Sequence, residues 1–217
     1  MATTATIPEG GTWLDTMKRS FEDVPVDESS DNAISTTEFL EAAESLVKLF
    51  DILGSVAFTP VKNDLLGNIK KIRDRQLAAP AESETLQALV LNELKTKQHK
   101  ATEGLVWLIR QVAYYGNTYS GLDFTAQAFS RNLSMESEEL ASSFREAYTN
   151  TLKPHHSFVV KPIFSAAMSA TPYRKDFYAK LGSDEQKIHA AMKKEICALE
   201  KRVAILNEFL ARKEAKW

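Results

Sequence analysis

The sequence predicts an all-α fold of about eight helices in packed layers. Apolar residues recur every three or four positions along most of the chain, which is typical of helices with one buried face. Start and stop signals divide these stretches into separate helices, and no segment alternates apolar and polar residues for long enough to predict a strand. With 217 residues, 44% of them hydrophobic, we expect one domain over residues 1–217, of which residues 1–11 are disordered.

Two helices are predicted in the first quarter of the chain. Apolar residues at helical spacing predict a short one over residues 13–21, before an acidic linker. Ser35 and Glu38 have the spacing of a capping box and predict the start of a longer helix. Its apolar face continues to Gly54, a residue type that commonly follows the last turn of a helix.

Three helices are predicted next. Thr59 reads as the N-cap, and Pro60 as the first residue, of a helix that closes near Pro80. Apolar periodicity predicts two more helices, over residues 84–97 and 101–115.

In the second half, a break at residues 116–121 precedes a brief helix near residues 124–129. Ser134 is predicted to cap a longer helix, which Pro154 bends or ends. A short helix over residues 173–181 follows.

The last helix is predicted to start at Ser183 and Gln186, which have the spacing of a second capping box. Its apolar residues are Ile188, Met192, Ile196, Leu199, Val203, Leu206 and Leu210. Such a seam pairs with another chain or packs inside its own domain, and in a domain of this size we expect internal packing.

Three unlike polar side chains share one strip of the helix that starts near Thr59. Asp64, Asn68 and Lys71 stand at positions i, i+4 and i+7 and therefore point the same way. A carboxylate, an amide and an ammonium side by side suit a ligand with several hydroxyls or an amide group. The alternative is an ordinary exposed strip in which Asp64 supports Lys71 by an ion pair.

Composition and motifs exclude several functional classes. A formal charge of −2 provides no overall field for nucleic acid, so no nucleic-acid partner is expected. The single cysteine excludes an intrachain disulfide and a cysteine-rich zinc site. The chain has no nucleophile elbow, phosphate loop or His-Glu-x-x-His motif, so we expect no enzymatic activity, no metal and no cofactor. Without a secretory signal or an apolar stretch of spanning length, a cytoplasmic location is expected.

Three blocks of sequence resemble the glycolipid transfer protein family, particularly its fungal heterokaryon-incompatibility branch. They are FTPVKNDLLGNIKK at residues 58–71, ATEGLVWL at residues 101–108, and HSFVVKPIF at residues 156–164, the last followed by ATPYRKDF at residues 170–177. The likeness covers residues 36–182 in order and spacing. It implies the family's two-layer helical fold, which parts around lipid tails.

The resemblance also implies roles for five residues. Asp64, Asn68 and Lys71 would hydrogen-bond a sugar headgroup, and Trp107 would be the platform beneath the sugar ring. Asp64 and His156 would bind the ceramide amide. An indole face suits the C–H groups of a pyranose, whose hydroxyls need directional polar partners. Without the resemblance, the favoured interpretations are a core aromatic for Trp107 and, for His156, a helix-end or core histidine satisfied by backbone groups.

Six apolar residues are candidates for lining the lipid-tail pocket, although each would serve equally in an ordinary core. They are Phe50, Phe58, Leu65, Phe144, Leu152 and Phe164.

The predicted membrane-docking residues are Phe158, Val159, Lys161 and Pro162. Phe158 stands where the family's animal members usually have tryptophan, and it lacks the indole N–H that favours the headgroup zone. We therefore expect weaker membrane anchoring. The animal members also place a tyrosine near the headgroup at the C-terminal end, where this chain has Phe209 and Trp217.

The function implied is non-enzymatic transfer of simple neutral glycosphingolipids, of the glucosylceramide or galactosylceramide type, by a monomer that contacts membranes transiently. One alternative is transfer of ceramide-1-phosphate. Asn68 and Trp107 argue against it because a phosphate needs cationic donors, whereas Arg110 leaves it open. The other alternative is a glycosphingolipid sensor in fungal incompatibility and cell death.

Overall fold

Helices account for most of the structure, a computed structural model that describes residues 6–54, 56–109, 121–154 and 156–216. The α-helices are α1 (Thr36–Val47), α2 (Leu49–Ile52), α3 (Thr59–Ala78), α4 (Leu86–Lys95), α5 (Lys100–Ile109), α6 (Gly121–Ser134), α7 (Leu140–Asn150), α8 (Val160–Ser169), α9 (Arg174–Ala179) and α10 (Glu185–Ala211). The short 3-10 turns are η1 (Trp13–Thr16), η2 (Phe21–Asp23), η3 (Glu28–Ser30), η4 (Val56–Phe58), η5 (Pro80–Glu82) and η6 (Lys213–Ala215). The predicted all-α class is confirmed.

Strand structure in the described ranges is limited to a two-stranded antiparallel ladder. Its strands are β1 (Val26–Asp27) and β2 (Ala33–Ile34), each two residues long. The ladder closes the acidic linker against the start of α1, so it positions the N-terminal segment without forming a sheet core.

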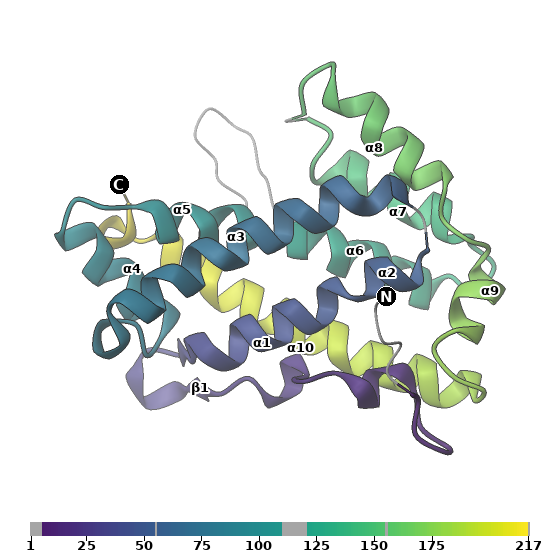
Figure 1. The fold of residues 1–217 in the computed structure, drawn as a ribbon, viewed down its shortest axis with the longest axis horizontal. Coiled ribbons are helices and arrows are strands. Elements are labelled where there is room, and N and C mark those ends of the chain that lie inside the picture. Colours follow the sequence, from purple (N-terminus) through teal and green to yellow (C-terminus); the bar gives the residue numbers. More distant parts are fainter. Residues whose placement is uncertain (1–5, 55, 110–120, 155, 217) are drawn as a thin grey trace.

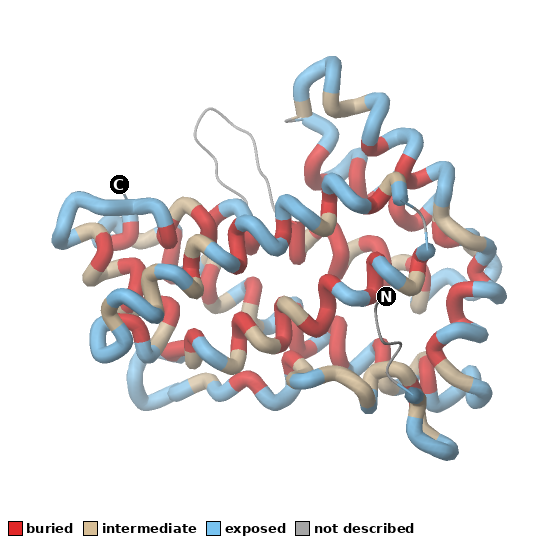
Figure 2. Tube along the Cα trace, viewed as in Figure 1, coloured by how far each residue is buried: buried red, intermediate tan, exposed pale blue. Residues whose placement is uncertain are grey.

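The helices pack in layers. In Figure 1, α1 and α3 lie on the near side, with α6 and α10 behind them. Helix α3 packs on both α1 and α5, and α6 packs on both α7 and α10. Each helix turns its buried face toward the space between the layers, as the alternation of red and blue along the tube shows in Figure 2. This arrangement follows from the one-sided apolar pattern of the sequence.

Aromatic rings occupy the centre of the core. The Phe144 ring on α7 lies 5.9 Å from that of Phe58, 5.7 Å from that of Phe124 and 5.3 Å from that of Phe129, measured between ring centroids. The Phe50 ring lies 5.7 Å from that of Phe58. These edge-on and tilted contacts are the geometry that aromatic pairs prefer, and they join α2, η4, α6 and α7.

The predicted internal packing of the last helix is confirmed, because every member of its apolar seam is buried. The seam residues are Ile188, Met192, Ile196, Leu199, Val203, Leu206 and Leu210. They cover one side of α10 along its 27 residues, which packs on α6 and on η2.

Two predicted boundaries in the second half are wrong. Helix α6 is a full 14 residues, and Ser134 is its last residue instead of the cap of α7. The Ser134 hydroxyl donates to the Arg131 carbonyl at 2.8 Å, so it serves the end of α6. Helix α10 is capped by Asp184 instead of Ser183, since the Asp184 carboxylate accepts the Lys187 N–H at 3.0 Å.

The first-quarter predictions also need correction. The expected helix over residues 13–21 is a pair of 3-10 turns, η1 and η2. The Ser35 hydroxyl bonds the Glu38 carboxylate directly, and no backbone N–H is capped by Ser35, so the predicted box is incomplete. The predicted end at Gly54 (φ +72°) holds, although a break at Lys48 divides that helix into α1 and α2.

The expectation of disorder over residues 1–11 falls partly outside the described residues, which begin at residue 6. None of the described helices is both long and apolar enough to cross a membrane.

Candidate functional site

The site is built where α3 and α5 approach closely. The two helices run side by side in opposite directions (Figure 1). A Cβ added to Gly104 on α5 would lie 2.9 Å from the Cβ of Lys71 and 3.0 Å from the carbonyl oxygen of Asn68. Only glycine therefore lets the α5 backbone lie directly against this part of α3. Two of the predicted headgroup residues stand at this contact.

Trp107 lies one turn beyond Gly104 on the same face of α5. Because the helices are antiparallel, this position is displaced from Lys71 toward the end of α3 that carries Asp64. The Trp107 residue is 39% exposed, so the core-aromatic interpretation is wrong. The indole therefore reaches solvent beside the polar strip.

Asp64 reaches solvent from α3. The pKa of its carboxyl is raised above the usual range because the surrounding protein displaces water from it, and the nearby Lys71 ammonium partly offsets the increase. Lys71 itself pairs with a different residue, since its Nζ lies 3.6 Å from Oε1 of Glu103 on α5. The alternative in which Asp64 and Lys71 form an ion pair along α3 is therefore wrong.

Asn68 is 4% exposed, and within the described ranges its side-chain amide has no hydrogen-bond partner. The amide still touches solvent, because no atom of Asn68 is among the fully buried side-chain atoms that lack a partner in the described part of the chain. Asn68 therefore offers one acceptor and two donors at the edge of the α3–α5 contact.

His156 is held by aromatic side chains at the junction of α7 and α8. Its Nδ1 lies 3.1 Å from the Tyr148 hydroxyl, and its ring lies 4.3 Å from the Phe164 ring. Burial raises the pKa of the Tyr148 hydroxyl, and the rings of Tyr148 and Phe164 stack 5.2 Å apart. Side chains thus hold the imidazole in place.

The six predicted tail-lining residues are all buried, with exposed fractions from 0% to 8%. They are Phe50, Phe58, Leu65, Phe144, Leu152 and Phe164. Leu65 lies beneath the polar strip and meets α6, since a Cβ on Gly121 would lie 2.4 Å from its Cδ2. The apolar set therefore begins directly under the headgroup candidates and extends to α7 and α8.

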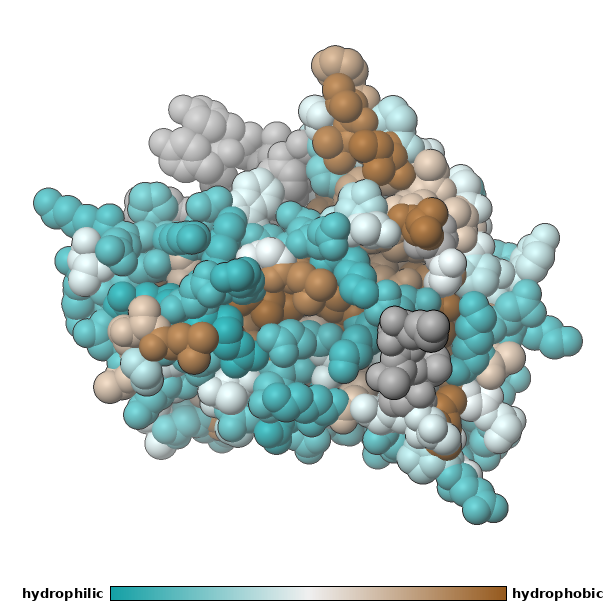
Figure 3. Space-filling view, viewed as in Figure 1, coloured by the Kyte–Doolittle hydropathy of each residue, from teal (hydrophilic) through white to brown (hydrophobic). Residues whose placement is uncertain are grey.

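An exposed apolar patch stands at the start of α8. Phe158 is 85% exposed and Val159 is 58% exposed, and both precede the helix. Ile163 on its first turn adds a further exposed aliphatic side chain, with Lys161 and Pro162 between them. Figure 3 shows apolar side chains gathered over α8 at the tip of the molecule. We call Phe158, Val159 and Ile163 the α8 patch.

Sequence reasoning missed three of these residues. Glu103 carried a weak signal, because it stands four positions before Trp107 and so shares its face of α5. Gly104, inside a helix, signals a close backbone approach. Ile163 shares the first turn of α8 with the predicted docking residues.

Three other residues that the sequence analysis considered are not part of the described site. Arg110 and Trp217 lie outside the described residues, and Phe209 is buried in α10.

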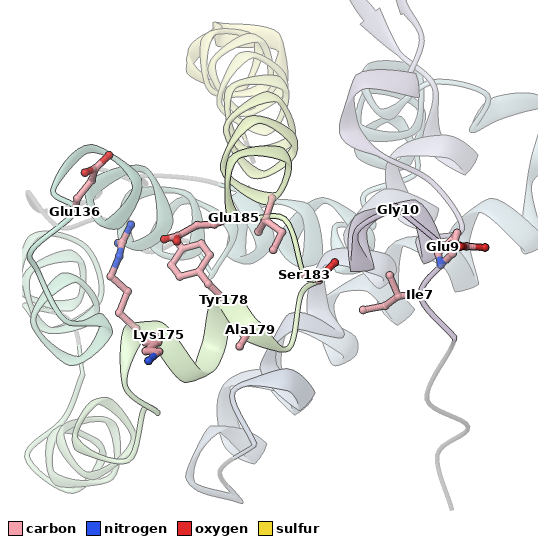
Figure 4. Close-up of a pocket in the computed structure, with 14 residues that line it drawn as sticks. Ile7, Glu9, Gly10, Glu136, Lys175, Tyr178, Ala179, Ser183 and Glu185 are labelled. Atoms are coloured by element: carbon pink, nitrogen blue, oxygen red, sulfur yellow. The ribbon is translucent and has the colours of Figure 1, made fainter.

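A separate open hollow of about 900 Å³ lies between the N-terminal segment, α9 and the start of α10. Figure 4 shows Tyr178 of α9 next to Glu185 at the start of α10, with Ser183 in the connection between the two helices. Burial raises the pKa of Tyr178 to about 12. The described residues that line it include none of the predicted site residues, so this hollow is distinct from the α3–α5 site.

Comparison with known proteins identifies the family. A family model described as "Glycolipid transfer protein (GLTP)" matches residues 34–183. A glycolipid transfer protein of Aureobasidium melanogenum is 62% identical over 213 residues, which are 98% of this chain and 100% of the relative.

Two solved structures share the fold. The fungal glycolipid transfer protein HET-C2 superposes with a TM-score of 0.86 at 62% identity, covering 94% of this chain and 99% of that one. A FAPP2 structure, described as selecting simple glycosphingolipids with the GLTP fold, gives a TM-score of 0.79 at 31% identity, covering 92% and 95%. The match extends over the helices that carry the α3–α5 site, and the chain belongs to the glycolipid transfer protein family.

Proposed function

We propose that this protein binds simple neutral glycosphingolipids and carries them between membranes without making or breaking a covalent bond. The observation that carries the proposal is the unpartnered amide of buried Asn68, next to Asp64 and Lys71 and on the side of α5 that presents Trp107. This set brings an amide, a carboxylate, an ammonium and an indole to one contact between two helices.

The sugar would lie between α3 and α5. Its C–H face would rest on the indole of Trp107, and its hydroxyls would meet Asp64, Asn68 and Lys71. Neutral hydroxyls donate and accept, which suits a set that contains a carboxylate, an amide and an ammonium. Each good hydrogen bond contributes about 1 kcal/mol, and more to a charged partner.

The ceramide amide would lie between Asp64 and His156. The Asp64 carboxylate would accept the amide N–H, and a ring nitrogen of His156 would donate to the amide carbonyl. The Tyr148 hydroxyl lies 3.1 Å from Nδ1 of His156 and would hold the ring in place for this contact.

The two lipid tails would enter among the six buried apolar residues that start at Leu65. These side chains pack against one another, so the helix layers would part as the tails slide in. Each buried methylene contributes about 0.8 kcal/mol relative to water. A bilayer buries the same methylene groups, so moving the lipid from the bilayer into the protein changes the free energy little. Extraction of the lipid is therefore reversible.

The α8 patch would dock on the membrane. Exposed apolar side chains that cluster, as Phe158, Val159 and Ile163 do, are typical of surfaces that contact a membrane or a partner, and Lys161 beside them suits lipid headgroups. The contact would be transient, made by a cytoplasmic monomer whose residues 1–217 form one lipid-binding domain.

The names of the relatives support this substrate class. The relative of 62% identity is called a glycolipid transfer protein, and the FAPP2 structure is described as selecting simple glycosphingolipids.

Vesicle-to-vesicle transfer with labelled galactosylceramide and labelled ceramide-1-phosphate tests the proposal. We expect galactosylceramide to move and ceramide-1-phosphate to move far more slowly. Preferential transfer of ceramide-1-phosphate would contradict the headgroup assignment. Tight binding of galactosylceramide without transfer would assign the protein to lipid sensing instead.

A further inference from the structure

Glu103 is a carboxylate at the edge of the candidate sugar site that neither the sequence motifs nor the family roles assign. Its Oε1 lies 3.6 Å from Nζ of Lys71, and its side chain is 42% exposed. It precedes Trp107 by four positions on α5, so both side chains stand on the same face. A sugar resting on Trp107 and bonded to Lys71 would lie close to this carboxylate.

The residues assigned to the candidate sugar site carry a net negative charge. Asp64 and Glu103 contribute two carboxylates against the single ammonium of Lys71. The neighbouring α3 lysines do not change this balance, because Lys62 pairs with Asp51 at 2.5 Å and Lys70 with Asp74 at 2.7 Å.

Beyond α3, exposed Lys100 stands one turn before Glu103 and two turns before Trp107 on the same strip of α5, so it lies further along the helix from the indole than Glu103 does, and Arg110 lies outside the described residues.

The stability of the fold does not explain the ion pair between Lys71 and Glu103. Ion pairs with solvent access contribute little to folding, because water screens them and both side chains lose freedom. A bound ligand that displaces this water would feel the same charges more strongly. The Glu103 carboxylate therefore matters more to the ligand than to the fold.

We propose that Glu103 is a specificity residue that disfavours anionic headgroups. It holds the Lys71 ammonium toward sugar hydroxyls and repels a sulfate or phosphate that would otherwise take that ammonium. A neutral sugar loses nothing by this arrangement, since its hydroxyls can donate to a carboxylate. This inference rests on the proposed function, because it assumes that the sugar binds at the α3–α5 site.

The test compares two lipids that differ only by a charged group. Transfer of galactosylceramide and of 3-sulfogalactosylceramide is measured from neutral phosphatidylcholine vesicles, so that membrane docking contributes equally to both. Glu103→Gln removes the charge and keeps the shape. The matched control is Asp74→Asn, which removes the carboxylate of the exposed Lys70–Asp74 pair on α3.

In Glu103→Gln we expect the ratio of sulfated to neutral lipid transfer to rise about ten-fold, equivalent to about 1.4 kcal/mol. In Asp74→Asn and in the charge-conserving Glu103→Asp the ratio should stay within two-fold of wild type. The rise should shrink at high salt, because screening weakens the repulsion. An unchanged ratio in Glu103→Gln would overturn the inference.

Failure of this inference is distinguishable from failure of the proposed function. If wild type transfers galactosylceramide but Glu103→Gln leaves the ratio unchanged, only the role of Glu103 is wrong. If wild type transfers neither lipid, the proposed function is wrong, and the role of Glu103 is wrong with it.

Discussion

Gly104 lies directly against Lys71, so that a single added methyl group would come within 2.9 Å of the lysine Cβ. The backbones of α3 and α5 meet at this point, and the meeting sets the distance between the polar strip of α3 and the indole on α5. The geometry of the site therefore depends on the absence of a side chain at residue 104.

Gly104→Ala should force the two helices apart. We expect a loss of about 1–3 kcal/mol in the free energy of unfolding, as for other overpacked contacts, and a larger proportional loss of galactosylceramide transfer. Urea denaturation and vesicle transfer measure the two effects. Normal transfer in a destabilised Gly104→Ala variant would show that the spacing of α3 and α5 does not control the site.

Gly67→Ala should have the opposite effect on stability. Gly67 lies on α3 one turn from both Asp64 and Lys71, and a Cβ there meets nothing within 4 Å. Alanine in an exposed helix is about 0.5–1 kcal/mol more stable than glycine, but here its methyl group would project into the candidate sugar site. We expect a higher unfolding midpoint together with slower glycolipid transfer. Faster or unchanged transfer would place the sugar elsewhere.

Phe158→Ser should weaken membrane docking by about ten-fold, since an apolar side chain of this size contributes roughly 1.5–3 kcal/mol when it leaves water. Phe158→Trp should strengthen docking, because the indole N–H favours the headgroup zone. Vesicle co-sedimentation measures both changes. The control is Leu77→Ser on the last turn of α3, where a leucine is 71% exposed away from the α8 patch. Equal losses in the Phe158 and Leu77 serine variants would contradict a localised docking surface.

Glu195 should make stability depend on pH. Its carboxylate on α10 is 2% exposed and accepts the Phe21 N–H and the Ser20 hydroxyl. Burial raises its pKa above the unfolded value, although these hydrogen bonds oppose the increase. The stabilising contribution is therefore complete below the unfolded pKa, near 4.3, and is lost as the pH rises through the folded pKa.

Glu195→Gln should flatten this part of the stability profile. The difference in unfolding free energy between pH 4 and pH 7 should change by about 1.4 kcal/mol for each unit of pKa shift. Urea denaturation between pH 4 and pH 7 measures the slope of the unfolding free energy against pH. A loss of hydrogen bonding that is the same at every pH does not alter this slope. A slope equal to that of wild type would show that Glu195 titrates normally.

The fold was predictable where a long apolar pattern dominated. Helices α3 and α10 follow from one-sided apolar repeats of many turns, which no local alternative could match. The end of α6 was not predictable from the same pattern. Serine is a common N-cap residue, so Ser134 was predicted to cap the next helix. Its hydroxyl instead bonds back to the Arg131 carbonyl. A serine can serve either end of a helix, and the pattern does not say which.

The sequence predicts which site residues share one face of a helix, but not which residues of two helices contact each other. Asp64, Asn68 and Lys71 share a strip of α3 by spacing alone, and Trp107 came from the family resemblance. The contact between Lys71 and Glu103 joins residues that are far apart in sequence. The residue pattern along either helix does not predict it. It depends on the close approach at Gly104, which the packing of α3 on α5 creates.

Transfer of labelled galactosylceramide between vesicles by wild type, Asp64→Val and Trp107→Ala tests the central claim most directly. The account predicts severe loss of transfer in both variants, with helical circular dichroism retained, because both side chains stand at the surface of α3 and α5 and not in the core. Transfer at the wild-type rate in either folded variant would contradict the claim that the α3–α5 site holds the sugar.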